Sequence, residues 1–211
     1  MKQALIVQGG WDGHYPRETS VILAEALRGA GFQVEVADTL DALRDGERLK
    51  ELSLIVPHWT MGRIEGEQLG PLLEAVSSGV GLAGIHGGMG DAFREQTEYQ
   101  FACGGQFVAH PGGLISYAVH IEDVPSPITE GLSDFEVTSE QYYMHVDPSL
   151  NVLATTVFAG VGPQPVVMPV TWTKGYGEGR VFYCSLGHSP DVLELPPVLT
   201  MVTRGMAWAA R

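Results

Sequence analysis

The chain has 211 residues, of which 45% are hydrophobic and 18% charged, a length and composition that suit one globular domain and are short for two. Its formal net charge is −13, and no Lys/Arg run is present, which argues against a nucleic-acid partner. No apolar run approaches the roughly 20 residues of a membrane span, and the amino-terminal MKQALIVQGG is typical of a strand and glycine turn rather than a signal peptide. Cys103 and Cys184 form no CxxC pattern, so we expect free thiols in a cytoplasmic protein without a membrane partner.

The first half of the chain alternates predicted strands and helices. Apolar or alternating stretches predict strands at residues 4–7, 32–36, 52–56 and 80–85. Helical spacing predicts intervening helices from Pro16 to about residue 29, at 42–49 and at 69–76, and we expect the third strand to end at Pro57. This order predicts an α/β fold, a flavodoxin-like doubly wound and mostly parallel sheet with helices on both faces.

The stretch SGVGLAGIHGGMGDAF at residues 78–93 is the most informative part of the sequence. An apolar strand leads into a glycine-rich turn with His86 at its apex, and Asp91 is placed to cap a following helix. A strand, a tight turn with one functional side chain and a helix form the arrangement of a nucleophile elbow. Hydrolases and amidotransferases carry Ser or Cys at this apex, whereas this chain carries His86.

The second half is less regular. Strands are predicted at residues 115–121, 136–144, 152–158 and 180–186, with loops at 123–129 and 160–169 and a hairpin across 174–179. A helix at 196–210 closes the chain. We find no repeat or linker, and therefore expect a single domain spanning residues 1–211.

Four histidines are predicted to lie at or just after the ends of strands, namely His14, His58, His86 and His188. In an open α/β sheet these positions meet at the carboxyl edge, where ligands bind. A single histidine of this kind usually makes a backbone hydrogen bond in a loop. Four at corresponding positions favour a shared pocket.

A carboxylate in the segment SEQYYMHVDP at residues 139–148 is the candidate partner of these imidazoles. Glu140 could orient them, raise their pKa or act as a general base, with Tyr142 and His145 close by. An exposed strand carboxylate beside core tyrosines explains the same segment equally well.

The sequence predicts no cofactor. No HxH or HxxxH pair is present, so we assign no metal ligand, while a His/Glu site for a divalent metal assembled from distant loops stays open. The glycine turns lack the spacing of nucleotide-binding loops. Trp11, Trp59, Phe93 and Trp172 lie near these loops and could stack on a sugar ring, or each could belong to the core.

Together these residues resemble the ThuA-like family of trehalose-utilisation proteins, whose fold is similar to that of class I glutamine amidotransferases. The matching segments run along the whole chain: QGGWDGH at 8–14, GLAGIHGG at 81–88, GGQFVAH at 104–110, SEQYYMHVDP at 139–148 and GRVFYCSLGH at 179–188. In the amidotransferase comparison His86 stands where the catalytic Cys would be, and His188 stands where the histidine of the triad follows a late strand. Without the Cys no glutaminase thioester forms, so that activity should be absent.

The resemblance implies a role in carbohydrate catabolism on a small-molecule carbohydrate, a sugar or 3-keto sugar. We expect acid–base isomerisation, epimerisation or elimination by His14, His86, Glu140 and His188, with Glu140 or His86 as the base and His188 as the acid. The substrate-binding candidates are Gly10, Trp11, His58, Trp59, Gly87, Phe93, His110, Tyr142 and His145. The alternatives are a non-catalytic carbohydrate-binding or regulatory protein and a metal-dependent hydrolase. A homodimer is expected only because most oligomers are homodimers.

Overall fold

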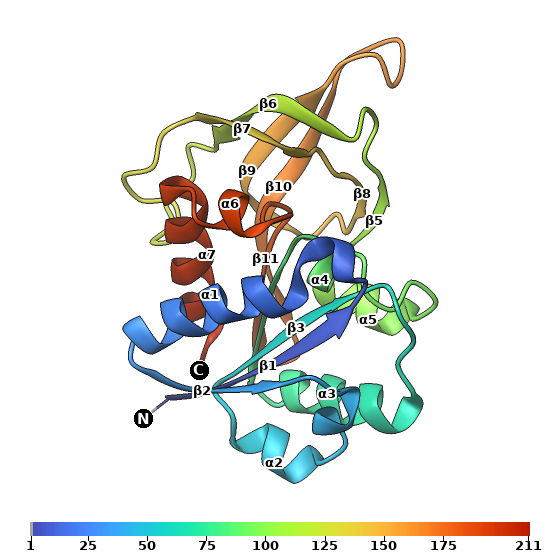
Figure 1. The fold of residues 1–211 in the computed structure, drawn as a ribbon, viewed down its shortest axis with the longest axis vertical. Helices are drawn as coiled ribbons and strands as arrows, with labels where there is room; N and C mark the ends of the chain where they lie inside the picture. Colours follow the sequence, from blue (N-terminus) through green and yellow to red (C-terminus); the bar gives the residue numbers. More distant parts are fainter. Residues whose placement is uncertain (1) are drawn as a thin grey trace.

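A nine-stranded sheet forms the centre of the computed structural model, which describes residues 2–211 (Figure 1). The strand order across it is β2-β1-β3-β4-β11-β10-β9-β6-β7. Its strands are β1 (Lys2–Gly10), β2 (Phe32–Ala37), β3 (Leu54–Thr60), β4 (Gly81–Ile85), β6 (Leu114–Ile121), β7 (Phe135–Glu140), β9 (Asn151–Phe158), β10 (Val166–Tyr176) and β11 (Gly179–Cys184).

The first five strands of this order pair in parallel, and we call them the parallel half. Helices connect β1, β2, β3 and β4 in turn, whereas the long connection from β4 to β11 carries both helices and the remaining strands. The helices are η1 (Asp12–His14), α1 (Pro16–Gly29), η2 (Leu40–Leu43), α2 (Gly46–Glu51), α3 (Gly66–Ser77), α4 (His86–Gly90), α5 (Thr97–Cys103), α6 (Pro190–Leu193) and α7 (Pro196–Ala209).

The parallel half has a hydrophobic core on each face. Successive residues of β1 alternate between the two: Leu5 and Val7 pack in the core with α3, and Ala4 and Ile6 pack in the core with α1 and α7. A strand buried on both faces has no polar side, which is why β1 is continuously apolar at its centre. The predicted doubly wound α/β fold is confirmed.

The predicted end of the third strand at Pro57 is wrong, because β3 continues to Thr60. Proline lacks the N–H that a central strand donates to its neighbours. However, β3 pairs with β4 only through Leu54 and Ile55, so from Val56 onward it pairs on one side alone, with β1. Pro57 is therefore tolerated, because at this position β3 has no hydrogen-bonded neighbour on the β4 side.

The other four strands of the sheet pair antiparallel, from β10 through β9 and β6 to β7, and we call them the antiparallel half. The strand expected at 136–144 is two strands, because β7 ends at Glu140 and β8 (Tyr143–Val146) pairs instead with β5 (Gly105–Ala109) in a separate two-stranded sheet. The loop expected at 160–169 is shorter, since β10 begins at Val166. The helix expected at 42–49 is interrupted and forms η2 and α2.

No helix within residues 2–211 is both long and apolar enough to cross a membrane. Both cysteines, Cys103 and Cys184, are buried and free. Burial raises the pKa of Cys103 to about 12 and that of Cys184 to about 11, so neither thiol is a ready nucleophile.

Candidate functional site

The elbow of the parallel half lies where β4 ends and α4 begins. His86 is the first residue of α4 and has a φ of 43°, a left-handed conformation that is strained for a residue with a Cβ. This is the geometry expected of a nucleophile elbow, with an imidazole at the apex. The imidazole is held at the carboxyl edge of the sheet with 1% of its surface exposed.

The predicted capping role of Asp91 is wrong. The helix starts directly after the strand, with Ile85 as its N-cap, so Asp91 comes at the other end, where it is the C-cap residue. Its buried carboxylate accepts two hydrogen bonds from Arg94, at 2.6 and 2.8 Å. Asp91 therefore fixes the exit of the elbow rather than its start.

Three neighbours fix the orientation of His86. Its Nδ1 lies 2.7 Å from the backbone oxygen of Ser185, and the Tyr183 hydroxyl donates to the backbone oxygen of His86 at 3.0 Å. The ring of Tyr142 stacks on the imidazole with centroids 4.1 Å apart. Because a carbonyl oxygen can only accept, Nδ1 must carry a proton, and Nε2 is the atom that faces the site.

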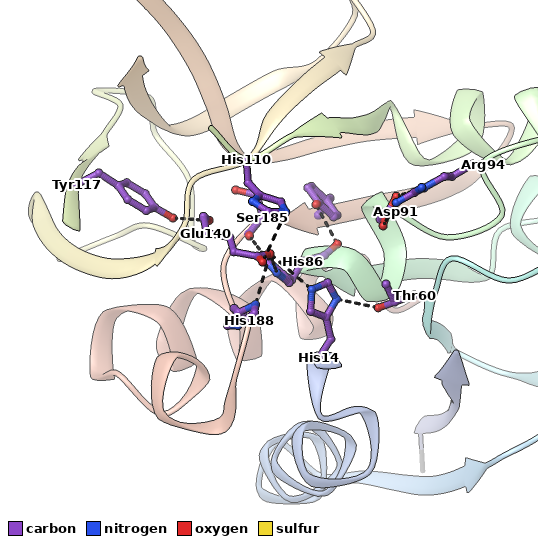
Figure 2. Close-up of polar contacts among 11 residues, drawn as sticks. His14, Thr60, His86, Asp91, Arg94, His110, Tyr117, Glu140, Ser185 and His188 are labelled. Carbon is purple, nitrogen blue, oxygen red and sulfur yellow. Dashed lines mark hydrogen bonds and ion pairs between the residues drawn. The ribbon is translucent and has the colours of Figure 1, made fainter. Parts of the chain in front are cut away.

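Three side chains from distant parts of the chain, those of His14, Glu140 and His188, converge in front of His86 (Figure 2). Oε2 of Glu140 lies 3.2 Å from Nε2 of His86, 3.5 Å from Nε2 of His14 and 3.4 Å from Nδ1 of His188. One donor atom from each of these residues lies within 4.8 Å of all the others, so the set has the size and the donor atoms to hold a metal ion.

Glu140 enters this cluster from the antiparallel half, as the last residue of β7. The Tyr117 hydroxyl donates to its backbone oxygen at 3.1 Å. Its second carboxylate oxygen, Oε1, lies 3.7 Å from Nε2 of His110, whose side chain is 40% exposed. One oxygen of Glu140 therefore faces the three buried imidazoles, and the other faces the open side of the site.

The protonation states follow from burial and contact. Burial lowers the pKa of His86 to about 4, so its imidazole is neutral at pH 7. Burial also acts to raise the pKa of Glu140, but contacts with His14, His188 and His86 outweigh it and hold that pKa well below its usual range. Glu140 is therefore a carboxylate throughout the neutral range.

Two glycines of α4 permit this close packing. A Cβ on Gly87 would lie 2.5 Å from the ring of His14, and a Cβ on Gly88 would lie 2.4 Å from Nδ1 of His58. Any side chain at either position would push an imidazole aside. The two glycines of IHGG therefore make room for the rings of His14 and His58 as well as permitting the turn.

The structure places several predicted substrate-binding residues away from the cluster. His58 lies behind α4, fully buried, with Nε2 2.7 Å from the Thr19 hydroxyl, and burial together with the neighbouring imidazoles lowers its pKa to about 4. Phe93 is in the core against Tyr99. Trp59 packs over Gly9 and is partly buried.

Two further predicted residues also lie outside the cluster. Gly10 makes a close backbone approach, since a Cβ there would lie 2.2 Å from the oxygen of Thr60. His145 is exposed on β8 and lines a separate surface hollow of about 510 Å³. No residue that lines that hollow belongs to the cluster.

Four predicted residues do border the cluster. Gly87 and Tyr142 contact its members as described above, and His110 faces Glu140. Trp11 is 48% exposed, and its ring lies 4.8 Å from that of His14. Trp11 and the partly exposed His110 thus lie between the cluster and the solvent-accessible surface.

Sequence reasoning missed two residues that orient the imidazoles. The backbone oxygen of Ser185 accepts a hydrogen bond from Nδ1 of His86, and the Thr60 hydroxyl lies 3.0 Å from Nδ1 of His14. A backbone oxygen carries no sequence signal at all. Thr60 had one weak signal, its place at the end of the strand next to β1.

Fold and elbow together define a doubly wound α/β protein with an imidazole at the apex of its elbow. Comparison with known families agrees: the model of the ThuA family, described as trehalose utilisation, matches residues 3–209. The chain belongs to the ThuA family, and the resemblance drawn from the sequence is confirmed.

Solved structures similar to this chain are distant in sequence. A ThuA-like protein from Parabacteroides merdae superimposes with a TM-score of 0.80 at 19% identity, over 99% of this chain and 89% of that one. A ThuA-like protein from Bacteroides uniformis gives 0.80 at 17% identity, over 99% and 91%. A cytoplasmic protein from Salmonella typhimurium LT2 gives 0.70 at 13%, over all of both chains. At these identities the likeness establishes the fold. No curated protein sequence matches the chain.

Proposed function

We propose that this protein acts in carbohydrate catabolism, catalysing proton transfer on a sugar or 3-keto sugar at the cluster of His14, His86, Glu140 and His188 and the adjoining His110. The description of the family as trehalose utilisation supports the substrate class. We also propose a cytoplasmic location, because the structurally similar Salmonella protein is described as cytoplasmic.

The observation that carries the proposal is the contact between the elbow imidazole and Glu140. An amidotransferase needs a thiolate at the apex, and the residue there is His86, whose Nε2 lies 3.2 Å from a carboxylate oxygen of Glu140. Imidazoles and a carboxylate are the groups that move protons in general acid–base catalysis. The site therefore favours a reaction without a covalent enzyme intermediate.

Glu140 and His110 are the pair that we assign to proton transfer. Oε1 of Glu140 and Nε2 of His110 lie 3.7 Å apart, which is too long for a direct hydrogen bond and leaves both atoms free for a substrate hydroxyl or carbonyl. We assign His110, whose side chain is partly exposed, as the proton acceptor, with the Glu140 carboxylate beside it. Trp11, exposed beside His14, offers its ring to a sugar face.

The proposed step begins at a carbon next to the ketone of a 3-keto sugar. His110 removes the C–H proton, the electron pair moves into the carbonyl, and an enediolate forms. Return of the proton to the other carbon gives an isomer, and return to the opposite face of the same carbon gives an epimer. No oxidant or reductant is consumed.

Proton NMR in D₂O tests this proposal. Purified protein incubated with 3-keto-glucose or 3-keto-trehalose should incorporate deuterium beside the carbonyl, above the buffer blank. We expect incorporation to fall by about 10²–10⁴-fold in His110→Ala and in Glu140→Gln, the range typical of a lost acid–base group. His120→Ala is the matched control, because His120 is exposed and paired with Asp134 outside the cluster. Exchange that is equal in all four proteins would contradict the assignment.

The burial of the cluster favours a second candidate, a carbohydrate-binding protein without turnover. Side chains of His14 and Glu140 are only 7% and 10% exposed, which limits the access of substrate carbons. Calorimetric binding of a sugar that produces neither exchange nor product, and that persists in His110→Ala, would support this alternative.

A further inference from the structure

The proton on His86 is assigned by its surroundings. Nδ1 donates to the backbone oxygen of Ser185 at 2.7 Å, so in the neutral ring Nε2 carries a lone pair. That lone pair faces Oε2 of Glu140, itself a carboxylate oxygen, at 3.2 Å. Two electron-rich atoms at this distance repel each other unless a cation lies between them.

Protons alone account poorly for this convergence. A proton on Nε2 of His86 would satisfy only one of three contacts with the same oxygen. The contacts of His14 and His188 with Oε2 do not have hydrogen-bond geometry, and Nδ1 of His188 is buried without a hydrogen-bond partner in residues 2–211. Three nitrogens therefore aim at one oxygen with at most one hydrogen bond formed.

The distances match those around a single metal ion. Ligand atoms at about 2.0–2.1 Å from a tetrahedral Zn²⁺ lie about 3.3 Å from one another. The distances from Oε2 of Glu140 to its three nitrogen neighbours are 3.2, 3.4 and 3.5 Å. The whole set lies within 4.8 Å, so one ion can reach every donor after small side-chain movements.

The contacts behind the donors are those that metal-binding imidazoles need. A ligating histidine usually gives its other N–H to a carbonyl or hydroxyl oxygen, which fixes the ring and its tautomer. His86 does this through Ser185, and His14 has the Thr60 hydroxyl 3.0 Å from its Nδ1. These contacts direct Nε2 of both rings toward Glu140.

From this geometry we propose that His14, His86, Glu140 and His188 bind one divalent first-row transition metal ion, such as Zn²⁺. Three imidazoles with one carboxylate suit these metals, whereas Mg²⁺ and Ca²⁺ prefer oxygen ligands. The inference goes beyond the proposed function, because it rests on the donor geometry and not on any reaction.

The metal site leaves the groups assigned to proton transfer free. Oε2 of Glu140 is the ligand, while Oε1 and Nε2 of His110 remain on the open side. A bound ion would polarise a substrate carbonyl as a Lewis acid.

Zinc titration tests the proposal directly. Protein purified without a histidine tag is stripped with EDTA and titrated calorimetrically with Zn²⁺ alone. We expect one Zn²⁺ per chain for the wild type. Changes behind a metal ligand typically cost about 10–100-fold in affinity, so loss of a ligand in Glu140→Gln or His188→Ala should cost at least about 100-fold. His120→Ala removes an exposed imidazole and should bind like the wild type.

Absence of binding by the wild type, or equal binding by Glu140→Gln and His188→Ala, would overturn the proposal. Circular dichroism checks that the variants are folded. X-ray absorption of the zinc-loaded wild type needs no variant: imidazole scattering around the ion supports the site, and its absence overturns it.

The metal site and the proposed function can fail separately. If EDTA-treated protein binds no Zn²⁺ but still catalyses deuterium exchange, the metal-site proposal fails and the proton-transfer proposal stands. If the protein binds Zn²⁺ tightly but exchanges deuterium into no sugar tested, the metal-site proposal stands and the proposed reaction fails.

Discussion

The two halves of the sheet contribute different chemistry to the same site. The parallel half supplies imidazoles: His14 follows β1, His86 follows β4 and His188 follows β11. The antiparallel half supplies the carboxylate, Glu140 at the end of β7, and the two-stranded sheet beside it supplies His110 after β5 (Figure 1). Neither half alone holds the complete set.

This division shows how the family's elbow differs from one with a nucleophile. A nucleophile at the apex needs a base from the same carboxyl edge, whereas the partner of His86 is a carboxylate, Glu140, which lies 54 residues further along the chain. The antiparallel half thus adds a carboxylate to the imidazoles that the parallel half supplies. Mutations that separate the two halves should disrupt the whole site, whereas the effects of mutations within one half should be confined to that half.

The largest expected effect comes from Trp172, which joins the two halves. It lies on β10, its Nε1 donates to the oxygen of Cys103 at 3.0 Å, and its ring lies 4.4 Å from that of Tyr183 on β11. Because Trp172 is fully buried, Trp172→Ala should lower the free energy of unfolding by about 3–5 kcal/mol. Urea unfolding measures this. Trp11→Ala, at an exposed tryptophan, should change it by no more than about 0.5 kcal/mol, and equal losses would contradict the account.

A smaller effect is expected at Gly87, within the parallel half. A methyl group there would lie 2.5 Å from the His14 ring, so Gly87→Ala should displace His14 and weaken zinc binding by about 10–100-fold. Gly29→Ala is the matched control, because a Cβ at Gly29 meets nothing within 4 Å. Zinc titration of both variants measures the difference. Unchanged affinity in Gly87→Ala would mean that His14 is not a ligand.

The smallest effect is a pH dependence outside the site, at Asp147. Hydrogen bonds from Ser149 and then from Lys174 lower the pKa of Asp147 from 3.8 to about 2. A carboxyl whose pKa is lower in the folded state stabilises the fold above pH 4, and this contribution is lost as the pH falls toward 2. Asp147→Asn should therefore lower the free energy of unfolding by about 1 kcal/mol at pH 5 and by less at pH 2.5. A difference that grows on acidification would contradict the sign.

Much of the parallel half could be predicted from the sequence, because its signals are local. Apolar strands, helical spacing and the IHGG turn each lie within a few residues, and the elbow with His86 follows from them. Pro57 was misread because its effect depends on how far β4 extends alongside β3, which is a matter of tertiary pairing.

The antiparallel half and the completed cluster were harder to predict. Periodicity identifies strands but does not say which strands pair, so the separation of β7 from β8 was missed. The approach of Glu140 to three imidazoles depends on that pairing. The donors also come singly from four distant positions, and therefore no local pair indicated a metal.

Anomalous diffraction from zinc-soaked crystals tests the central claim most directly. The account predicts one strong zinc peak bounded by Nε2 of His14, Nε2 of His86, Nδ1 of His188 and Oε2 of Glu140. Peaks confined to exposed histidines such as His120 or His145, with none at the cluster, would contradict it.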